Sequence, residues 1–404
     1  MKICMVSNLY PPYIHGGAEL YVSHISERLS DRHDISVITA APFGRNGSST
    51  RDKVGERKDA IYRFYPLNLY SNYYYSRKPG FIKPLWHAFD IWNPHTYSFI
   101  KDALKRERPD LVHVHNFSGL SASVFSAAKD LDIPAVHTVH DYTLICPKTT
   151  LLTRANASCV NARSPCRVYR WFYKRIDPAV VIAPSDFVLN TLSGFGLFAD
   201  TRKLKLPLGI PESEPVAKVN NGTFDILYVG RLGKHKGVHS LIESVKGLDL
   251  KNARLHVVGQ GSDGARFQRD ARDDERIVFY GFLAPDTLRQ LYSIADVAVV
   301  PSIYAETFGL VIPEYYQHGI AVIGSRTGAI PELIEDGYNG FLFPPGDVAA
   351  LTSLLQMLSS DSKLLSEMSK NARTSARTFD LDVHVQKLEE IYEEVTLRSP
   401  PRTR

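Results

Sequence analysis

The sequence lacks any long hydrophobic run. No uninterrupted apolar stretch approaches the roughly 18 residues needed to span a bilayer. The apolar run that begins at Met1 is short and is soon broken by Pro11 and Pro12, which is not the pattern of a secretion signal. We therefore expect a cytoplasmic protein, with peripheral attachment at the inner face of the plasma membrane as the alternative location.

Cysteine is scarce, because four residues in a chain of 404 cannot form a disulfide framework. Three of them, Cys146, Cys159 and Cys166, cluster in one segment, but their intervals match no common zinc spacing. The sequence predicts ordinary reduced thiols and no metal. A metal site or a loop staple remains the alternative.

Several catalytic and binding motifs are also missing. The chain contains no HExxH metalloprotease motif, no EF-hand loop, no Walker GxxxxGK[ST] loop and no GxSxG elbow. The GxGxxG fingerprint of an NAD-dependent dehydrogenase is absent between Ser7 and Gly17, after the first expected strand. The net charge of +5 is modest, and acidic and basic residues are interspersed, which argues against a nucleic-acid-binding protein.

The remaining pattern is typical of an α/β protein with two domains. The 404 residues exceed the size at which single cores usually stop growing. In the first half, β-branched runs alternate with helical patterns, which predicts parallel strands joined by crossover helices. We expect strands at 2–7, 34–40, 61–66, 111–115, 135–140 and 180–183, and helices at 18–29 and 121–131. The polar segment from Arg45 to Arg57 is a predicted loop.

A change of composition at Leu206–Thr223, rich in proline, glycine and asparagine, marks a linker. The second half then repeats the alternation, with strands expected at 224–229, 254–258, 277–280, 297–300 and 321–324, and closing helices at 349–358, 363–378 and 381–395. The sequence thus predicts two Rossmann-like domains with doubly wound parallel sheets. Their expected bounds are 1–207 and 223–380, with a linker at 208–222 and a helix at 381–397 that returns to the N-terminal domain.

The segment from Val299 to Gly319 has the strongest functional signal. A buried strand ends here, a polar loop follows, and a helix begins near Gly309. Glu306 in the loop and Glu314 in the helix would lie at different depths along one ligand, so one could hold a sugar and the other a ribose. The free amides at the start of this helix are suited to bind phosphate. They are the amides of Thr307, Phe308, Gly309 and Leu310.

Two cations lie in the glycine-bearing loop between the strand 224–229 and the next helix. Arg231 could grip phosphate oxygens with its planar fork, and Lys236 supplies a compact charge. Together they would neutralise the charge that builds up on a departing nucleoside diphosphate. A solvated basic turn is the alternative, since Lys234 and His235 are adjacent.

Glycines in other strand-to-helix loops are weaker candidates. Gly16 and Gly17 follow the first strand, where a doubly wound sheet presents ligands. Gly259 and Gly261 end a strand of the second half and could let a nucleotide base lie against the backbone. The loop with Gly328, Pro331 and Glu332 could shape the same cleft. In each case a structural turn is the alternative.

Two histidines end the expected strand 135–140. Because side chains alternate along a strand, His137 and His140 fall on opposite faces, and at most one points to a ligand. His140 is nearer the carboxyl end and is the better candidate. His113 and His115, within another strand, are predicted to be structural.

The chain resembles the family 4 retaining glycosyltransferases. Four motifs carry the resemblance in order. They are Gly16-Gly17-Ala18-Glu19, Gly230-Arg231 with Lys236-Gly237, Val258-Gly259-Gln260-Gly261, and Pro301-Ser302 through Glu306-x7-Glu314. The run HDYTLICP around His140 is also similar to members of this family and favours a positioned Cys146. The resemblance spans almost the whole chain, but residues 45–97 match no motif.

This resemblance implies a GT-B fold, in which two Rossmann-like domains face each other across a cleft and the C-terminal domain binds a nucleotide-activated sugar. The donor would be UDP- or GDP-linked, with no metal or cofactor. The family implies retention at the anomeric carbon, by same-face attack in which the leaving phosphate accepts the acceptor's proton.

Site roles follow from the same resemblance. Arg231 and Lys236 would contact the diphosphate and Glu314 the ribose hydroxyls. Glu306, with the nearby helix-start amides, would bind the donor sugar and phosphate, and His140 would lie beside the transferred sugar.

Two aromatic and basic segments bear on the acceptor. Residues 70–92, with Arg77, Lys78 and Lys83, and residues 167–175 could rest on an anionic membrane surface, or their aromatics could pack internally. The sequence therefore favours a saccharide or lipid-linked saccharide acceptor, in surface polysaccharide or glycolipid assembly. A nucleotide-sugar epimerase or hydrolase of similar fold, and a noncatalytic nucleotide-sugar-binding subunit, are the alternatives.

Overall fold

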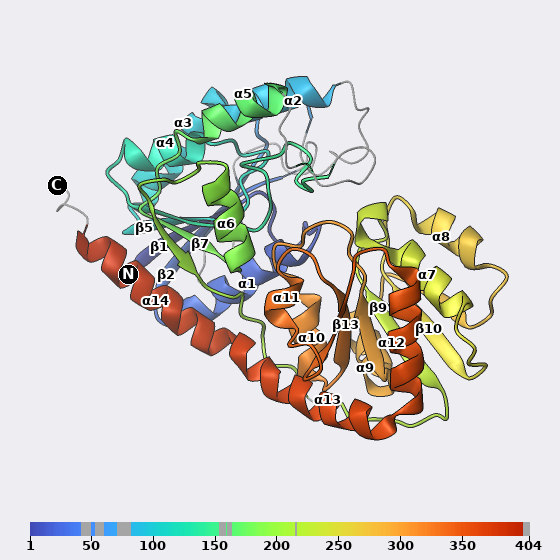
Figure 1. The fold of residues 1–404 in the computed structure, drawn as a ribbon. Coiled ribbons are helices and arrows are strands. Elements are labelled where there is room, and N and C mark those ends of the chain that lie inside the picture. Colours follow the sequence, from blue (N-terminus) through green and yellow to red (C-terminus); the bar gives the residue numbers. More distant parts are fainter. Residues whose placement is uncertain are drawn as a thin grey trace. The chain divides into compact units, whose positions relative to one another are not determined.

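The computed structural model describes residues 1–41, 50–52, 60–70, 82–152, 159, 164–214 and 216–398. The chain divides into two units (Figure 1), unit 1 with Met1–Thr149, Val160–Gly209 and Leu381–Arg404, and unit 2 with Ile210–Asp380 and Thr150–Cys159. Most of the predicted loop at 45–57 lies outside the described residues. The same holds for the predicted aromatic and basic residues Tyr73, Tyr74, Tyr75, Arg77, Lys78 and Phe81.

Unit 1 is built on a sheet whose order, among the described residues, is β3-β4-β2-β1-β5-β6-β7-β8. Neighbouring strands pair in parallel, except that β3 is antiparallel to β4. The strands are β1 (Lys2–Ser7), β2 (Asp34–Ala40), β3 (Thr50–Asp52), β4 (Ala60–Phe64), β5 (Leu111–Val114), β6 (Ala135–Thr138), β7 (Val180–Ala183) and β8 (Arg202–Lys205).

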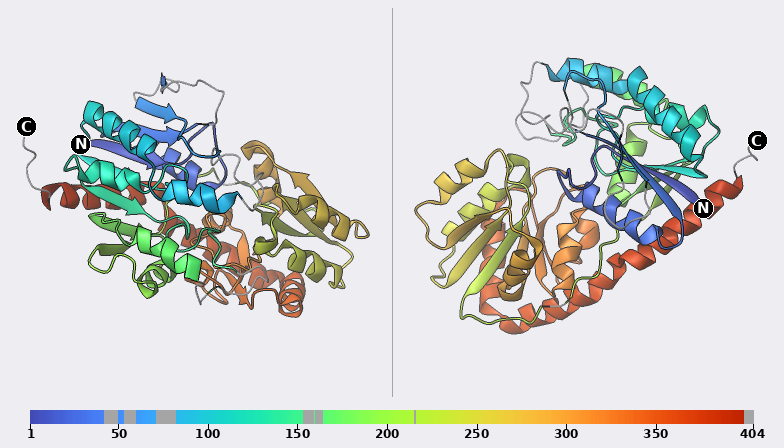
Figure 2. Two further views of the ribbon diagram at one scale, coloured as in Figure 1. Left: turned by 90° about the horizontal axis from the view of Figure 1, so that it is seen from above. Right: turned by 180° about the vertical axis from the view of Figure 1, so that it is seen from behind.

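Helices cover this sheet, namely α1 (Gly17–Leu29), α2 (Lys83–Ile91), α3 (Pro94–Glu107), α4 (Ser123–Lys129), α5 (Ser164–Tyr173) and α6 (Asp186–Gly194). The long α14 (Leu381–Arg398) belongs to the same unit and packs beside α1 (Figure 2). Its Tyr392 hydroxyl lies 2.6 Å from Nδ1 of His113 on β5. The last helix of the chain is therefore part of the first unit's core.

Unit 2 is an all-parallel sheet of order β11-β10-β9-β12-β13-β14 among the described strands. The strands are β9 (Phe224–Val229), β10 (Ala253–Val258), β11 (Ile277–Gly281), β12 (Val297–Val300), β13 (Ala321–Ser325) and β14 (Gly340–Phe343). The helices are α7 (Val238–Lys246), α8 (Gly264–Ala271), α9 (Pro285–Ile294), α10 (Val311–Gln317), α11 (Ile330–Leu333), α12 (Val348–Ser360) and α13 (Ser362–Ala376), with the 3₁₀ turns η2 (Lys234–Lys236) and η3 (Arg377–Phe379).

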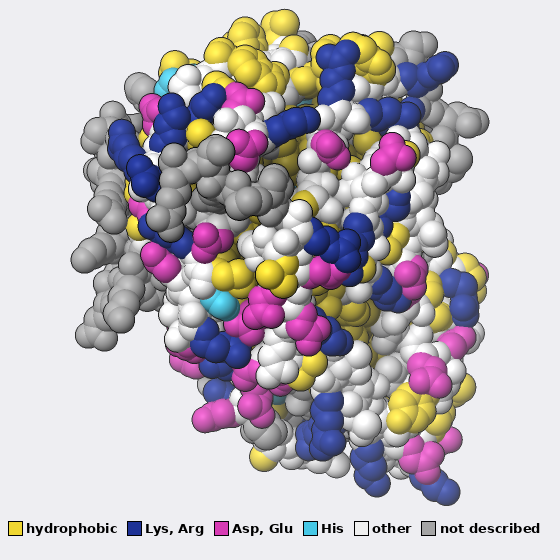
Figure 3. Space-filling model, turned by 90° about the vertical axis from the view of Figure 1, so that its left-hand side faces the viewer, with side chains coloured by type: hydrophobic (Ala, Val, Ile, Leu, Met, Phe, Trp, Pro, Cys, Tyr) yellow, Lys and Arg dark blue, Asp and Glu magenta, His cyan; other side chains and the backbone are white. Residues whose placement is uncertain are grey.

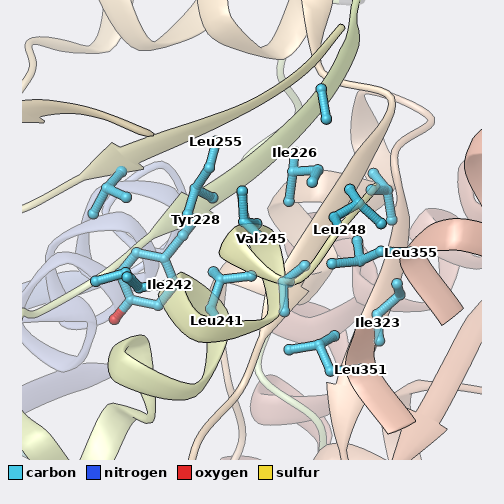
Figure 4. Close-up of a cluster of buried hydrophobic side chains, with 14 of the residues drawn as sticks. Ile226, Tyr228, Leu241, Ile242, Val245, Leu248, Leu255, Ile323, Leu351 and Leu355 are labelled. Atoms are coloured by element: carbon cyan, nitrogen blue, oxygen red, sulfur yellow. The ribbon is translucent and has the colours of Figure 1, made fainter. Parts of the chain in front are cut away.

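The core of unit 2 shows why these segments adopt these elements. The strands are near-continuous apolar runs because a parallel sheet is buried on both faces. Figure 4 shows Leu241 and Val245 of α7 in one cluster with the strand residue Ile226 and the α12 residue Leu355. Side chains four apart on a helix share one face, so α7 presents a single apolar stripe to the sheet.

The prediction of two Rossmann-like, doubly wound domains is confirmed. Three described strands were not predicted, and each lies at or beside a sheet edge. β8 is an edge strand with the sequence RKLK. Edge strands often carry charged side chains, which block pairing with other chains. Such a sequence has no apolar run, so it was not predicted as a strand. The strand predicted at 135–140 ends at Thr138, so His140 lies in the loop after β6.

Gly259 allows a test of the packing at the end of β10. Its φ is +131°, and a Cβ there would lie 1.9 Å from the carbonyl oxygen of Gly230. Gly259→Ala is expected to lower the free energy of unfolding of unit 2 by about 3 kcal/mol or more, because left-handed strain and overpacking add. Urea unfolding measures the change.

Gly346 is the matched control, since its φ is +79° and a Cβ there meets nothing within 4 Å. Gly346→Ala should cost only about 1–2 kcal/mol of conformational strain. Equal effects of the two substitutions would contradict the close approach of the backbones at Gly259.

Candidate active site

The candidate site in unit 2 lies where the sheet reverses its order. β9 is central; the chain adds β10 and β11 on one side and then β12 to β14 on the other. Ligands bind at such switch points because the loops after the two central strands leave in opposite directions. The amides of Ile303 and Tyr304 both donate to the carbonyl of His235, at 2.9 and 3.2 Å, and so join these two loops.

An ion pair between Lys236 and Glu306 forms the centre of this arrangement. The Lys236 ammonium lies 2.7 Å from Oε1 of Glu306 and donates to the Tyr304 hydroxyl at 3.3 Å. Glu306 Oε1 also accepts from Ser302 Oγ at 2.5 Å, and Oε2 accepts from the Tyr304 hydroxyl. Two residues 70 positions apart are thereby fixed to each other.

The surroundings keep Glu306 ionised although it is buried, with 5% of its surface exposed. Burial raises the pKa of its carboxyl, but the charge of Lys236 and the hydrogen bonds from Lys236, Ser302 and Tyr304 outweigh burial and leave the pKa below its ordinary value. Neither Ser302, which is part of the motif from Pro301 to Glu314, nor Tyr304 was given a role from sequence. Their signal was only their place in the loop beside Glu306.

The predicted anion site at 307–310 precedes α10, which begins at Val311. The amides of Phe308, Gly309 and Leu310 donate to no carbonyl of the described backbone. Gly309 has a φ of +103°, which favours glycine. The Phe308 side chain is buried against Phe379, so only its amide could serve a ligand, and the Thr307 side chain is half-buried.

The two other predicted contact residues of unit 2, Glu314 and Arg231, lie in different environments. Glu314, on α10, is half-buried, and desolvation raises its pKa to about 7. Arg231, directly after β9, is exposed to solvent. Both positions suit the predicted contacts with ribose and diphosphate, which stay predictions.

Gly259 and Gly261 have a packing role. A Cβ on Gly261 would lie 2.3 Å from the Leu232 carbonyl oxygen, as one on Gly259 would crowd Gly230. These glycines let the loop after β10 press against the loop that carries Arg231. Their predicted contact with a nucleotide remains a prediction. Gly328 behaves similarly, because a Cβ there would lie 2.3 Å from the backbone nitrogen of Glu306.

In unit 1 the switch point falls between β1 and β5. Gly16 and Gly17 open α1 beside it, and the Gly16 amide donates to Oε2 of buried Glu19 at 2.8 Å. Gly16 has an extended backbone with φ of −168°, so its conformation does not require glycine. We still predict that a glycine occupies this position because it leaves space for a ligand.

His140 lies in the loop after β6 and is half-buried. Its Nε2 is 3.1 Å from Nδ1 of His115, and the Tyr21 ring of α1 packs against it at 5.3 Å between centroids. His137 bonds the Val114 carbonyl through Nδ1 at 2.9 Å and is buried, as expected of a structural residue. His115, predicted to be structural, in fact contacts the candidate residue His140.

The four cysteines form no disulfide, and Cys146 is buried. Within the described part of the chain, no group of three or more His, Cys, Asp or Glu side chains is placed to hold a metal ion.

Comparison with known proteins agrees with these observations. Residues 15–204 match the family model for Glycosyltransferase Family 4, and residues 210–375 match that for Glycosyl transferases group 1. Among curated relatives, an uncharacterized 42.6 kDa protein in the cps region of Klebsiella pneumoniae is 25% identical over 82% of this chain and 87% of its own length. Glycogen synthase of Mycobacterium tuberculosis is 28% identical over 92% of this chain and 89% of its own length.

Solved structures share the fold. Sucrose-phosphate synthase from Thermosynechococcus elongatus superposes with a TM-score of 0.79 at 20% identity, covering 98% of this chain and 99% of that one. Alr3699/HepE from Anabaena, in complex with UDP-glucose, gives a TM-score of 0.69 at 20% identity, covering 98% of this chain and 100% of that one.

These observations define a glycosyltransferase of the GT-B type. The chain belongs to glycosyltransferase family 4, as its motifs predicted.

The histidines of unit 1 make its stability depend on pH. Burial lowers the pKa of His137 to about 4 and of His140 to about 3, and it lowers that of His113, His115 and His384 as well. Between pH 6.5 and 4 the unfolded chain therefore binds more protons than the folded chain. The free energy of unfolding of unit 1 consequently decreases as the pH decreases. We expect His137 and His140 each to remove about 2 kcal/mol of unfolding free energy between pH 7 and 5.

Asp90 acts in the opposite direction, because burial raises its pKa to about 7, and the folded protein then takes up a proton as the pH falls below 7. Asp90→Asn should therefore steepen the loss of stability. Urea midpoints at pH 5, 6, 7 and 8 measure both proteins. Constant or increasing stability at pH 5 would contradict neutral buried histidines.

Proposed function

We propose that this chain is a retaining, metal-independent glycosyltransferase that moves a sugar from a nucleoside-diphosphate sugar, UDP- or GDP-linked, to a saccharide or lipid-linked saccharide. The observation that carries the proposal is the Lys236 ammonium, held by Glu306 and Tyr304 at the switch point of unit 2. An ammonium has three N–H groups, and these two contacts leave one for a phosphate oxygen.

The residues of unit 2 meet the chemical demand of the transfer. As the sugar leaves, negative charge grows on the diphosphate, and fixed cations stabilise that charge without reorganising. Lys236 is fixed by its two partners, whereas Arg231 is exposed and carries a planar fork suited to bidentate contact with the oxygens. Amides at 308–310 would add neutral donors to the same phosphates.

The relatives favour the same substrates. Anabaena Alr3699/HepE, of the same fold, was solved with UDP-glucose, and the mycobacterial relative is a glycogen synthase. The first supports a nucleotide-sugar donor for this chain, and the second supports a saccharide acceptor. The Klebsiella relative from the cps region supports a place in surface polysaccharide assembly.

A surface of unit 1, which we call the α2/α5 face, supports a membrane-bound acceptor. α2 and α5 touch through the rings of His87 and Tyr169, 6.0 Å apart, and expose apolar side chains beside them. The exposed apolar residues are Leu85, Phe89, Trp92, Val168, Trp171 and Phe172, with exposed fractions of 37–60%.

Basic residues accompany this apolar surface. Arg167, Arg170, Lys174 and Arg175 lie on or just after α5, which contains no acidic residue, and the Arg175 guanidinium stacks on Trp171 at 3.8 Å. Figure 3 shows hydrophobic side chains with lysines and arginines gathered at the upper edge, where α2, α3 and α5 lie in Figure 1. Aromatic and basic side chains together are typical of a surface that rests on anionic lipid.

None of the described helices has both the length and the apolar character required to cross a bilayer.

Arg231→Ala and Lys236→Ala test the donor site. We expect each variant to lower kcat by about a hundredfold or more, since each removes a charge that stabilises the leaving diphosphate. The donor is first identified as the nucleotide-sugar, from a panel, that raises the thermal stability of the protein. Turnover of that donor is then measured with saccharide acceptors. The anomeric configuration of the product, read by NMR, checks retention.

Lys234→Ala is the control, because Lys234 is exposed in the same loop and lies outside the ion pair. It should retain near-normal turnover. Normal rates in Lys236→Ala would contradict the proposed role. Release or isomerisation of the sugar from donor alone, without acceptor, would favour a hydrolase or an epimerase instead.

The triple variant Arg170→Ala, Lys174→Ala, Arg175→Ala tests the α2/α5 face. Each basic residue near an anionic surface contributes about 1 kcal/mol, so the variant should bind phosphatidylserine vesicles on the order of a hundredfold more weakly. Vesicle sedimentation measures the affinity. The exposed pair Lys105 and Arg106 on α3 is the control, and unchanged binding in the triple variant would discredit the surface.

A further inference from the structure

The loop after β12, which carries Glu306, has a neighbouring loop on each side. β12 lies between β9 and β13 in the sheet of unit 2. On the first side, the His235 carbonyl in the loop after β9 accepts from the amides of Ile303 and Tyr304. On the other side lie residues 325–329 at the end of β13, which we call the β13 loop. The carboxylate site is thus built by three loops and not by two.

The β13 loop holds the backbone around Glu306 at two points. Ser325 Oγ donates to the Ser302 carbonyl oxygen at 2.6 Å, and the Ala329 amide donates to the Glu306 carbonyl oxygen at 2.8 Å. Gly328 lies between these two points with a φ of +59°, and a Cβ there would lie 2.4 Å from the Glu306 carbonyl oxygen. The loop is therefore in close backbone contact with the residue that carries the carboxylate.

The hydrogen bond from Ser325 is difficult to replace. Ser325 is fully buried, and Ser302 is 1% exposed. Among the described residues, no backbone amide donates to the Ser302 carbonyl, so the Ser325 hydroxyl is the donor that satisfies it. A buried carbonyl that loses its donor bears the full desolvation cost of that group, which favours movement of the backbone.

Ser302 connects this bond to the charged pair. Its hydroxyl donates to Oε1 of Glu306 at 2.5 Å, and the same oxygen accepts from Lys236 at 2.7 Å. Hydrogen bonds weaken steeply as their geometry departs from the optimum. If the Ser302 backbone moved, Glu306 would lose one of the donors that fix its carboxylate, and the Lys236 ammonium would be held less firmly.

We propose that Ser325 is a positioning residue of the donor site, which fixes the Lys236 ammonium in place by way of the Glu306 carboxylate. Because Ser325 is fully buried, it acts without touching the substrate. The inference rests on the proposed function in one respect, namely that Lys236 binds the donor diphosphate. The order of contacts is Ser325 to Ser302, Ser302 to Glu306, and Glu306 to Lys236.

The chemical reactivity of Lys236 tests this order of contacts without any substrate. A lysine amine is acetylated only in its neutral form, which an ion pair with a carboxylate disfavours. After brief treatment with acetic anhydride, mass spectrometry compares the label on Lys236 with that on Lys234 in the same loop. We expect this ratio to rise about threefold or more in Ser325→Ala and in Ser302→Ala. An unchanged ratio in Ser325→Ala would overturn the inference whether or not the chain transfers sugar.

Kinetics test the consequence for the reaction. We expect Ser325→Ala to lower kcat about tenfold, less than Lys236→Ala does, because the cation is displaced and not removed. In the double variant, Ser325→Ala should cause no further loss beyond that of Lys236→Ala, since it acts through the missing side chain. An equal additional loss in both backgrounds would show a merely structural role for Ser325 and overturn the inference.

Ser244→Ala is the matched structural control. Ser244 is also fully buried, and its hydroxyl donates to the carbonyl oxygens of Ser240 at 2.8 Å and of Val348 at 3.2 Å, between α7 and α12. This variant should keep kcat and the acetylation ratio near normal. Equal changes in Ser244→Ala and Ser325→Ala would contradict a specific role for Ser325.

Gly328→Ala displaces the same backbone from the other end of the β13 loop and should also raise the acetylation ratio, because its Cβ would overlap Glu306. Gly337→Ala is its control, since Gly337 has a φ of +84° and a Cβ there meets nothing within 4 Å. Equal ratios in these two variants would count against the inference. If the wild type transferred no sugar but all the acetylation ratios were as expected, the proposed function alone would fail.

Discussion

The ion pair between Lys236 and Glu306 holds the candidate site together. Taking a carboxylate and an ammonium out of water costs several kcal/mol per ion, and their attraction offsets this only when the remaining hydrogen-bonding capacity is also met. Here Ser302, Tyr304 and Lys236 all donate to the one carboxylate. This complete set of donors fixes the loop after β12 against the loop after β9.

The sheet makes such a pair possible. Lys236 and Glu306 lie 70 positions apart, and they meet because β9 and β12 are neighbours although two strands lie between them in sequence. The glycines at the ends of β10 and β9 allow the adjoining backbones to approach closely. The doubly wound order is therefore what converts residues distant in sequence into one charged site.

The two units differ in how they treat polar groups. Unit 2 buries a fully hydrogen-bonded carboxylate next to a cation, which suits an anionic diphosphate. Unit 1 buries rings whose pKa values are lowered by desolvation, so they stay uncharged near neutral pH. Neutral donors and acceptors suit the hydroxyl groups of a sugar, which carry no charge.

Much of this structure could be predicted from the sequence, and the failures have physical causes. Strands such as β1 and β9 were predicted to the residue, because buried parallel strands are uninterrupted apolar runs. β8 could not be found this way, since a charged edge strand has no such run. Lys236 and Glu306 were predicted from motifs, but Tyr304 matters through a loop conformation that no local pattern encodes.

Gly259 and His115 show a second kind of limit. Gly259 was predicted to contact a nucleotide, which stays a prediction, and the structure gives it a packing partner, the Gly230 carbonyl, which the sequence could not reveal. His115 was predicted to be structural because it lies within a strand run. Its contact with His140 depends on β5 and β6 being neighbours and on where β6 ends.

The hydrogen bonds of Glu306 bear on how an acceptor would be activated. Glu306 already accepts from three donors, which lower its proton affinity, so it is a poor base. Glu306 is therefore unsuited to take the acceptor's proton, and the predicted catalytic residues Arg231 and Lys236 are cations. In the retaining transfer that we propose, the departing phosphate would be the proton acceptor, because its developing negative charge would lie on the same face of the sugar as the attacking hydroxyl.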